Sequence, residues 1–305
     1  MTHRKMPGGS CEVEEVPITT SIKITTLCEN TASRVGLLAE WGLSILIETG
    51  EDNVLFDTGQ GTAAIHNAAA MGLDMHSIDK IVLSHGHRDH TGGLLSVLNA
   101  IRRDPDVDNE QRAIEVIAHP DIRMPRYSRP EFGKEVYAGI VFVRDVLENL
   151  GASFKLTRKP VWITESMVTT GEIPMQINYE KVDADLYVND DGNAHPDPVA
   201  DDLALAIVTD LGLVVILGCA HRGIINTLRR AQEVTDTKRI HMVIGGAHLF
   251  RASREQIEST IADLKRYDIK KIGVSHCTGL HAAARLSQEF GDRFFFNNAG
   301  TRINI

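Results

Sequence analysis

Residues 83–93 read Leu-Ser-His-Gly-His-Arg-Asp-His-Thr-Gly-Gly, with three imidazoles and one carboxylate between His85 and His90. Imidazole and carboxylate groups are the usual protein ligands of zinc and similar divalent ions. In an extended or turning segment, His85 and His87 can converge on one ion, while Asp89 and His90 turn toward a neighbouring position. A lone histidine is more often a core or surface residue, but this dense cluster predicts a metal site.

Short apolar runs and helical patterns surround the cluster on both sides. In the first half we expect strands at residues 21–28, 43–49, 54–57, 80–84 and 114–118, and helices at 62–71 and 94–102. In the second half we expect strands at 203–209, 213–217, 240–244 and 271–275, and further strands around Phe294 and Ile303. We expect helices at 223–232 and 281–290. Another helix is expected to begin at Ser253, where the sequence fits a capping box. Two strand-rich halves with interspersed helices predict two sheets covered by outer helices.

Residues 119–202 break this rhythm and form a predicted insertion, with one helix at 140–150 and several short strand candidates. The insertion ends in residues 183–202, which hold seven aspartates and no Lys or Arg. We interpret this end as a solvated surface loop, the alternative being a metal or partner site built from the aspartates alone.

Length and composition limit the number of domains, the kinds of partner and the cell compartment that we expect. The chain has 305 residues, a formal net charge of -9 and four scattered cysteines. The length gives a prior of roughly two domains, and the negative charge disfavours nucleic-acid and anionic-membrane partners. The cysteines do not form a disulfide framework, and the N-terminus lacks the apolar segment of a secretory signal, so we expect a cytoplasmic protein.

Several motifs resemble those of a known family. LSHGHRDHTGG resembles the HxHxDH signature of the metallo-β-lactamase superfamily, and LFDTGQG is similar to its strand-ending Asp-Thr-Gly. With EWGLSILIE, GCAHRGIIN, IGGAHLF and SHCTG in this order, the chain resembles the subfamily that includes dihydropterin-6-ylmethyl-(ribofuranosyl)aminobenzene 5'-phosphate synthase. The resemblance implies an α/β fold, an αββα sandwich of two mixed sheets flanked by helices. It also implies one domain over residues 21–305, after a flexible arm at 1–20 and with the insertion at 119–202.

The resemblance implies one or two divalent metal ions, with zinc expected first and manganese or iron as alternatives. Matching the motif positions assigns a first metal to His85, His87 and His221. It assigns a second metal to Asp89, His90 and His276.

Other residues near these motifs have open roles. Gly218-Cys219 stands where many relatives have Gly-Asp, so Cys219 is either a thiolate ligand or a small buried residue. We expect His248 to contact substrate and, with Asp89, to act in catalysis. Asp57 is expected to orient ligands through hydrogen bonds or to contact substrate, or it is an ordinary turn aspartate. A nucleophile at Cys277 beside His276 is disfavoured, because adjacent strand residues point to opposite faces.

The expected chemistry is attack of an activated water on a small ester or phosphoester. The basic loop that holds Arg126 and Arg129 is a candidate phosphate clamp, or a plain basic surface loop. One alternative function is a transferase that displaces diphosphate, as the synthase resemblance implies, and another is a metal-binding sensor without turnover. The expected partner is a small anionic molecule, with no nucleic acid and no membrane. The oligomeric state is open, a homodimer being one option.

Overall fold

The computed structural model describes residues 21–102, 113–129, 134–190 and 192–305, so the predicted arm at 1–20 lies outside the described part. Its largest sheet has seven strands in the order β16-β1-β2-β3-β4-β5-β8. The sheet is mixed, because β16, β1, β2 and β3 pair antiparallel while β3, β4, β5 and β8 pair parallel. The strands are β1 (Lys23–Cys28), β2 (Ser44–Glu48), β3 (Asn53–Phe56), β4 (Lys80–Val82), β5 (Ile114–Ala118), β8 (Ala152–Leu156) and β16 (Arg302–Asn304).

A second mixed sheet has five strands in the order β15-β14-β13-β12-β9. The strands are β9 (Met167–Thr169), β12 (Ala204–Ile207), β13 (Leu213–Leu217), β14 (Ile240–Gly246) and β15 (Lys271–Ser275). β12 and β13 pair antiparallel, and the turn Asp210-Leu211-Gly212 lies between them. The predicted strand around Phe294 is reduced to a single bridge between Phe294 and Ile272.

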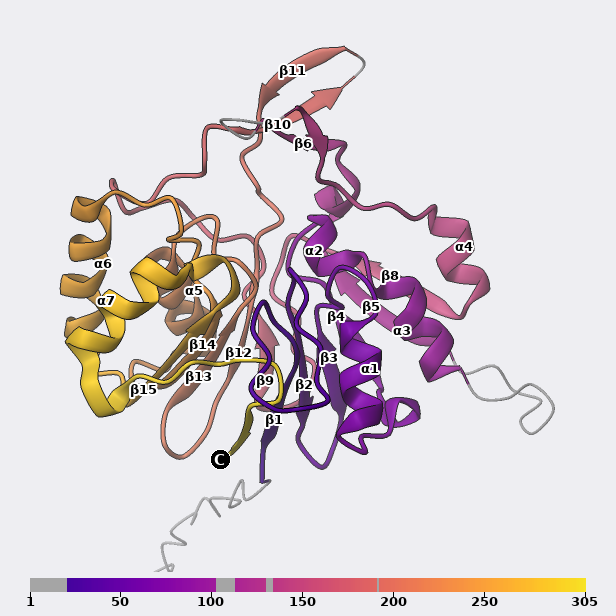
Figure 1. The fold of residues 1–305 in the computed structure, drawn as a ribbon, viewed down its shortest axis with the longest axis horizontal. Helices are drawn as coiled ribbons and strands as arrows, with labels where there is room; N and C mark the ends of the chain where they lie inside the picture. The colour runs from indigo at the N-terminus through magenta and orange to yellow at the C-terminus, as the bar shows by residue number, and fades with distance from the viewer. Residues whose placement is uncertain (1–20, 103–112, 130–133, 191) are drawn as a thin grey trace, which may run out of the picture.

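Helices cover the outer face of each sheet (Figure 1). On the seven-stranded sheet lie α1 (Ala63–Ala70) and α3 (Leu94–Ile101), and on the five-stranded sheet lie α5 (Ile224–Thr235), α6 (Arg254–Arg266) and α7 (Leu280–Phe290). Two shorter helices are α2 (Arg88–Thr91) and α4 (Arg144–Asn149). The predicted αββα sandwich is confirmed. No helix of the described segments is long and apolar enough to cross a membrane.

Alternating side chains explain how the layers pack. In β2, Ile45 and Ile47 point between the two sheets, while Leu46 packs against the helices on the other face. In β13, Ile216 points between the sheets and Val215 toward the outer helices. Each fully buried side chain of this kind stabilises the fold by about 1.5–3 kcal/mol, so the period-2 pattern fixes which face of each strand is inward.

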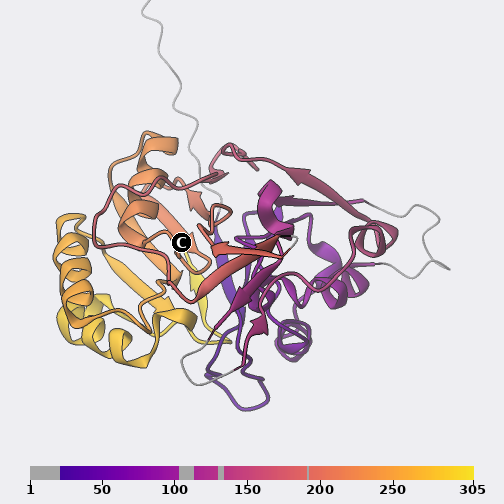
Figure 2. The same ribbon diagram turned by 90° about the horizontal axis from the view of Figure 1, so that it is seen from above.

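A third, antiparallel sheet stands above one edge of the sandwich (Figures 1 and 2). This cap sheet has the order β11-β10-β6-β7 and comprises β6 (Arg126–Ser128), β7 (Val136–Tyr137), β10 (Leu186–Asp190) and β11 (Asn193–Pro196). All four strands come from the predicted insertion at 119–202, which also supplies the edge strands β8 and β9 of the two main sheets. The insertion is therefore woven into the sandwich as well as placed on top of it.

Candidate metal centre and substrate pocket

The predicted ligands lie in loops at one edge of the sandwich. His85 and His87 follow β4, His221 follows β13, His248 follows β14 and His276 follows β15. These strands belong to parallel pairs, so their carboxyl ends meet at the same edge, where ligands of α/β sheets usually bind. The structure thus brings residues from both halves of the chain to one place.

The first predicted ligand set forms a triangle of ring nitrogens. His85 Nε2 lies 3.0 Å from His87 Nδ1 and 3.2 Å from His221 Nε2, and the last two atoms are 3.1 Å apart. Neutral imidazole nitrogens either donate or accept, so hydrogen bonds cannot satisfy all three contacts. Nitrogens bound tetrahedrally to zinc are about 3.3 Å apart, as metal–nitrogen bonds of about 2.0–2.1 Å require. The donor set therefore fits a divalent ion.

The second predicted set lies beside the first, with the ring centroids of His85 and His90 4.3 Å apart. His90 Nε2 is 3.2 Å from His276 Nε2, and Asp89 Oδ2 is 3.3 Å from the same His276 atom. Cys219 Sγ is 3.1 Å from His90 Nε2. These imidazole, carboxylate and thiol groups also suit a divalent ion.

Cys219 lies between the two sets. Its sulfur is within 4.8 Å of ligand atoms of His85 and His221, and equally of His90 and His276. The position is the one a bridging ligand would take. Ligation by Cys219 and the number of metals stay predictions.

Hydrogen bonds fix the orientation of the ligand rings. Asp57 Oδ2 accepts from His90 Nδ1 at 2.6 Å and from Ser84 Oγ at 2.7 Å, while Asp57 Oδ1 accepts from the backbone N–H of Ser84. The Asp57 carboxylate is fully buried and outside the pocket. It is therefore placed to hold His90, as carboxylates commonly hold metal-bound histidines, and not to contact substrate.

The protonation states of the two sets differ. Burial lowers the pKa of His85, His87 and His221, that of His87 to about 3, so the first set is neutral and keeps its lone pairs. Burial opposes charge on His90 as well, but Asp57 and Asp89 outweigh it and raise the pKa of His90 to about 9. The carboxylates of Asp57 and Asp89 thus favour a positive charge at the second set.

The backbone is strained where these loops turn. Asp57, Ala220, His248 and His276 all have φ between 45° and 59°, in the left-handed region that residues other than glycine rarely adopt. Such conformations persist where the surrounding structure holds them, and they often gather at functional sites. All four lie at or beside the predicted ligands.

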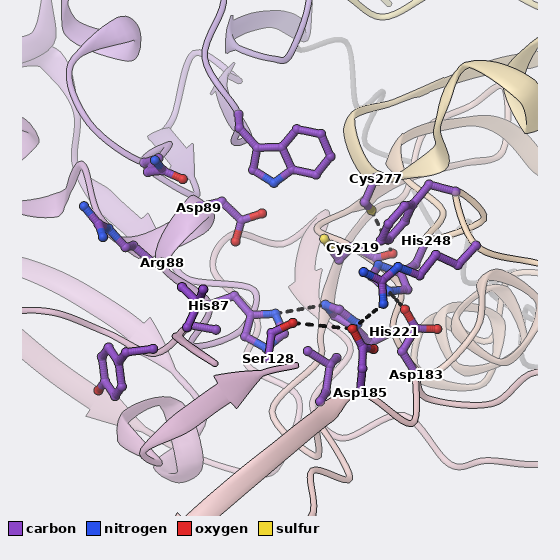
Figure 3. Close-up of a pocket in the computed structure, with 18 residues that line it drawn as sticks. His87, Arg88, Asp89, Ser128, Asp183, Asp185, Cys219, His221, His248 and Cys277 are labelled. Atoms are coloured by element: carbon purple, nitrogen blue, oxygen red, sulfur yellow. Dashed lines mark hydrogen bonds and ion pairs between the residues drawn. The ribbon is translucent and has the colours of Figure 1, made fainter. Parts of the chain in front are cut away.

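A pocket of about 360 Å³ opens over the ligands (Figure 3). His87, Asp89, Cys219 and His221 line its floor, and His248 stands beside them with Nε2 3.0 Å from Asp183 Oδ2. Burial alone would lower the pKa of His248, but Asp183 and Cys277 together outweigh this and raise it to about 10. The walls comprise Trp41, Gln60, Arg88, Ser128, Val136, Tyr137, Ala138, Asp185, Leu186, Phe250, Arg251 and Cys277.

The two predicted clamp arginines lie outside this pocket. Arg126 is only 1% exposed, and it donates to Asp197 from Nε and to Asp201 from Nη2, both at 2.7 Å. Its charge is thus already neutralised within the fold, which excludes the predicted phosphate contact. Arg129 is exposed and stacks on Tyr187, 4.2 Å from the ring centroid.

The buried partners of Arg126 also correct the prediction for residues 183–202. Asp197, Asp201 and Asp202 are buried rather than solvated. Asp201 Oδ2 accepts from the backbone N–H of Gly86, between two predicted ligands, and Asp202 Oδ2 accepts from that of Arg222. Asp201 and Asp202 thus brace the two loops that carry the predicted ligands of the first set.

Sequence reasoning missed the residues that shape the pocket wall. Arg88 stands inside the HxHxDH motif, and Trp41 lies in EWGLSILIE, but neither was identified as a site residue. Phe250 and Arg251 directly follow GGAHL, and Asp183 begins the aspartate-rich segment. Their closeness to the ligand motifs was the available signal, but it does not reveal which way each side chain points.

The chain is similar in sequence to known proteins. Residues 42–159 match the profile of the metallo-β-lactamase superfamily. A curated relative from Methanocaldococcus jannaschii, 7,8-dihydropterin-6-methyl-4-(β-D-ribofuranosyl)-aminobenzene-5'-phosphate synthase, is 35% identical over 93% of this chain and 97% of its own length. An uncharacterised protein from the same organism is 30% identical over 92% of this chain and all of its own.

Solved structures give the same fold. The crystal structure of Tm1679, a metal-dependent hydrolase of the β-lactamase superfamily, superimposes with a TM-score of 0.77 at 29% identity, covering 93% of this chain and 99% of that one. A diphosphatase of the PhnP family gives a TM-score of 0.52 at 12% identity, covering 93% of this chain and 97% of that one, a likeness of fold alone.

Proposed function

Since the chain belongs to the metallo-β-lactamase superfamily, we propose that it is a metal-dependent hydrolase of a small anionic ester or phosphoester. The observation that carries the proposal is the pair of adjacent donor sets, of which His87, His221 and Asp89 line one pocket. Divalent ions held by these sets would polarise the substrate and lower the pKa of water toward about 7.

The chain's own groups have distinct tasks in this reaction. Asp89 turns Oδ2 toward His90 and His276, which leaves Oδ1 to accept a hydrogen bond from the attacking water and orient it. His90 and His276 hold the pKa of Asp89 well below its usual range against the opposing effect of burial, so Asp89 accepts as a carboxylate. His248, protonated through Asp183, would donate a proton to the leaving oxygen from Nδ1.

Metal analysis followed by a substrate screen tests the proposal. The purified protein should contain zinc, manganese or iron, and it should hydrolyse at least one of a set of phosphomonoesters, phosphodiesters, lactones and thioesters. His87→Ala should lose metal and activity together, while His281→Ala, an exposed histidine on α7, should keep both. Full metal retention after removal of His85, His87 and His221 would contradict the site.

A synthase activity is the second candidate, favoured by the 35% identity to the synthase from M. jannaschii over almost the whole chain. The same metals would then hold a departing diphosphate, and an aromatic carbon or amine would replace water as nucleophile. Incubation with a dihydropterin diphosphate, with and without an aminobenzene ribotide, separates the two reactions. A hydrolase releases diphosphate without the ribotide, whereas a synthase needs it and yields a coupled product detectable by mass spectrometry.

A further inference from the structure

The loop between β1 and β2 contacts His276, which belongs to the other sheet. Glu29 and Asn30 directly follow β1, whereas His276 directly follows β15 of the five-stranded sheet. Glu29 Oε1 accepts a hydrogen bond from the backbone N–H of His276, and Glu29 Oε2 accepts from that of Thr31, both at 2.7 Å. Glu29 and His276 are buried. The strained backbone of His276, with φ of 53°, is therefore held by a carboxylate 247 residues earlier in the chain.

Asn30 contacts the ring of the same histidine. Its Oδ1 lies 2.9 Å from His276 Nδ1 and 3.2 Å from the backbone nitrogen of Gly42. The backbone N–H of Gly42 can only donate, so the Asn30 atom that faces it is the carbonyl oxygen. If the Asn30 side chain were turned over, its NH₂ group would face the Gly42 N–H, donor against donor. Because the carbonyl oxygen accepts, His276 Nδ1 must be the donor and must carry a proton.

A proton on Nδ1 leaves the other ring nitrogen of His276 free. A neutral imidazole carries hydrogen on one nitrogen only, so Nε2 keeps its lone pair. This atom lies 3.2 Å from His90 Nε2 and 3.3 Å from Asp89 Oδ2, the other predicted ligands of the second set. Asp57 orients His90 in the same way, because its Oδ2 accepts from His90 Nδ1. Acceptors that follow β1 and β3 therefore turn Nε2 of both rings toward one place.

The same loop packs against Asp89. The backbone N–H of Leu43 donates to the Asp89 carbonyl at 3.2 Å. A Cβ atom at Gly42 would lie 2.5 Å from that carbonyl oxygen, so only glycine fits there. Because the Gly42 N–H also binds Asn30, the loop fixes Asn30 relative to Asp89.

We propose that Asn30 is a positioning residue for the second predicted metal. It holds His276 with the proton on Nδ1 and the lone pair of Nε2 directed at the ion, while Glu29 holds the His276 backbone. Metal-bound histidines commonly donate their other ring N–H to such an acceptor. Asn30 lies outside the pocket, so it acts through His276 and does not contact substrate. The inference rests on the proposed function, in that it takes His276 as a metal ligand.

Nitrogen NMR tests the assignment in the unmodified protein. The chain has 13 histidines, which are labelled with ¹⁵N in the zinc-loaded protein. A long-range ¹H–¹⁵N spectrum shows which ring nitrogen of each histidine carries a proton, and the His276 signals are those missing from His276→Gln. We expect a proton on Nδ1 of His276, slow to exchange with water, and none on Nε2. A proton on Nε2 of His276 would overturn the proposal.

Variants at Asn30 test the positioning role. Asn30→Leu has a similar size but no acceptor. It should speed the exchange of the Nδ1 proton and raise the dissociation constant of the zinc ion that His276→Gln loses, by about 10–100-fold in a chelator competition. Asn30→Asp keeps an acceptor and should restore both properties. Asn99→Leu, at an exposed position of α3, is the matched control and should behave as the unmodified protein.

Equal zinc affinity in Asn30→Leu and Asn99→Leu would overturn the positioning role. If Asn30→Leu fails to fold, the spectrum of the unmodified protein and the zinc affinity of Asn30→Asp still decide, because loss of that zinc in Asn30→Asp would also count against the proposal. A proton on Nδ1 and the expected zinc affinities without turnover of any ester would refute the hydrolase function and leave the role of Asn30 intact. Turnover with a proton on Nε2 of His276 would have the opposite meaning.

Discussion

At the scale of single residues, Cys219 lies between the two predicted donor sets. Its sulfur is near ligand atoms of both sets, and Cys277 lies close by in the same pocket. Thiolate ligation to Co²⁺ produces a charge-transfer band in the near ultraviolet, which oxygen and nitrogen ligands do not give. We expect the Co²⁺-loaded protein to show this band, Cys219→Ser to lose it, and Cys277→Ser to keep it.

Cys28→Ser is the matched control for this experiment. Cys28 is also buried, but its thiol faces Glu40 and lies outside the pocket. Any general effect of placing a hydroxyl at a buried cysteine should therefore appear in this variant without loss of the band. An unchanged band in Cys219→Ser would exclude Cys219 as a ligand.

At the scale of secondary-structure elements, helix α5 depends on a carboxyl group from another segment. Its N-cap is Gly223, which has no capping side chain, and Glu180 accepts from the backbone N–H groups of Ile225 at 2.8 Å and Asn226 at 2.9 Å. Burial outweighs these two bonds and raises the pKa of Glu180 to about 7. The folded protein therefore favours the protonated group more than the unfolded chain does.

The sign of the resulting pH dependence follows from this raised pKa. The contribution of Glu180 to the free energy of unfolding is fully present below its ordinary pKa of 4.5 and is lost as the pH rises through about 7. Glu180→Gln should remove on the order of 2 kcal/mol of the difference in unfolding free energy between pH 5 and pH 8. Urea unfolding at both pH values measures it, with the exposed Glu51→Gln as control. Parallel pH profiles for the protein and Glu180→Gln would contradict the assignment.

The segment that contains the buried aspartates is a second element with a testable role. Asp201 joins Arg126 of the cap sheet to the backbone of Gly86, between the predicted ligands His85 and His87. Asp201→Asn leaves Arg126 with one carboxylate partner fewer and should destabilise the fold by about 3 kcal/mol. It should also weaken metal retention against a competing chelator. Asp145→Asn is the control, because Asp145 is exposed on α4. Equal metal retention in Asp201→Asn and Asp145→Asn would show that Asp201 does not support metal binding.

At the scale of the whole molecule, the predicted metal ligands come from both halves of the sandwich. His85 and His87 lie beyond the seven-stranded sheet, whereas His221 and His276 lie beyond the five-stranded sheet. An ion that binds only the folded state at 1,000 times its dissociation constant stabilises it by about 4 kcal/mol. Chelation should therefore lower the thermal midpoint by about 5–10 °C, and re-addition of metal should restore it. A midpoint insensitive to chelator would argue against a shared site.

The sequence predicted the sandwich, and it indicated that the candidate ligands would lie at one edge, because both depend on local patterns. Period-2 apolar runs define the strands, and each ligand motif directly follows one of them, so parallel pairing brings the ligands together. Arg126 was misassigned because its partners, Asp197 and Asp201, are 71 and 75 residues away in the chain. Because Arg126 is distant from Asp197 and Asp201 in the sequence, the sequence did not indicate that these aspartates are buried. Trp41 and Arg88 became visible only through the shape of the pocket.

The pairing of β1 with β16 has a consequence for synthesis of the chain. β1 (residues 23–28) leaves the ribosome early, but β16 (residues 302–304), which covers its free edge, comes last among the strands. Until then β1 presents unpaired backbone groups that can pair with another polypeptide. Nascent chains and refolding intermediates should therefore be more prone to aggregation than the finished protein, and chaperones that shield exposed strands should raise the yield.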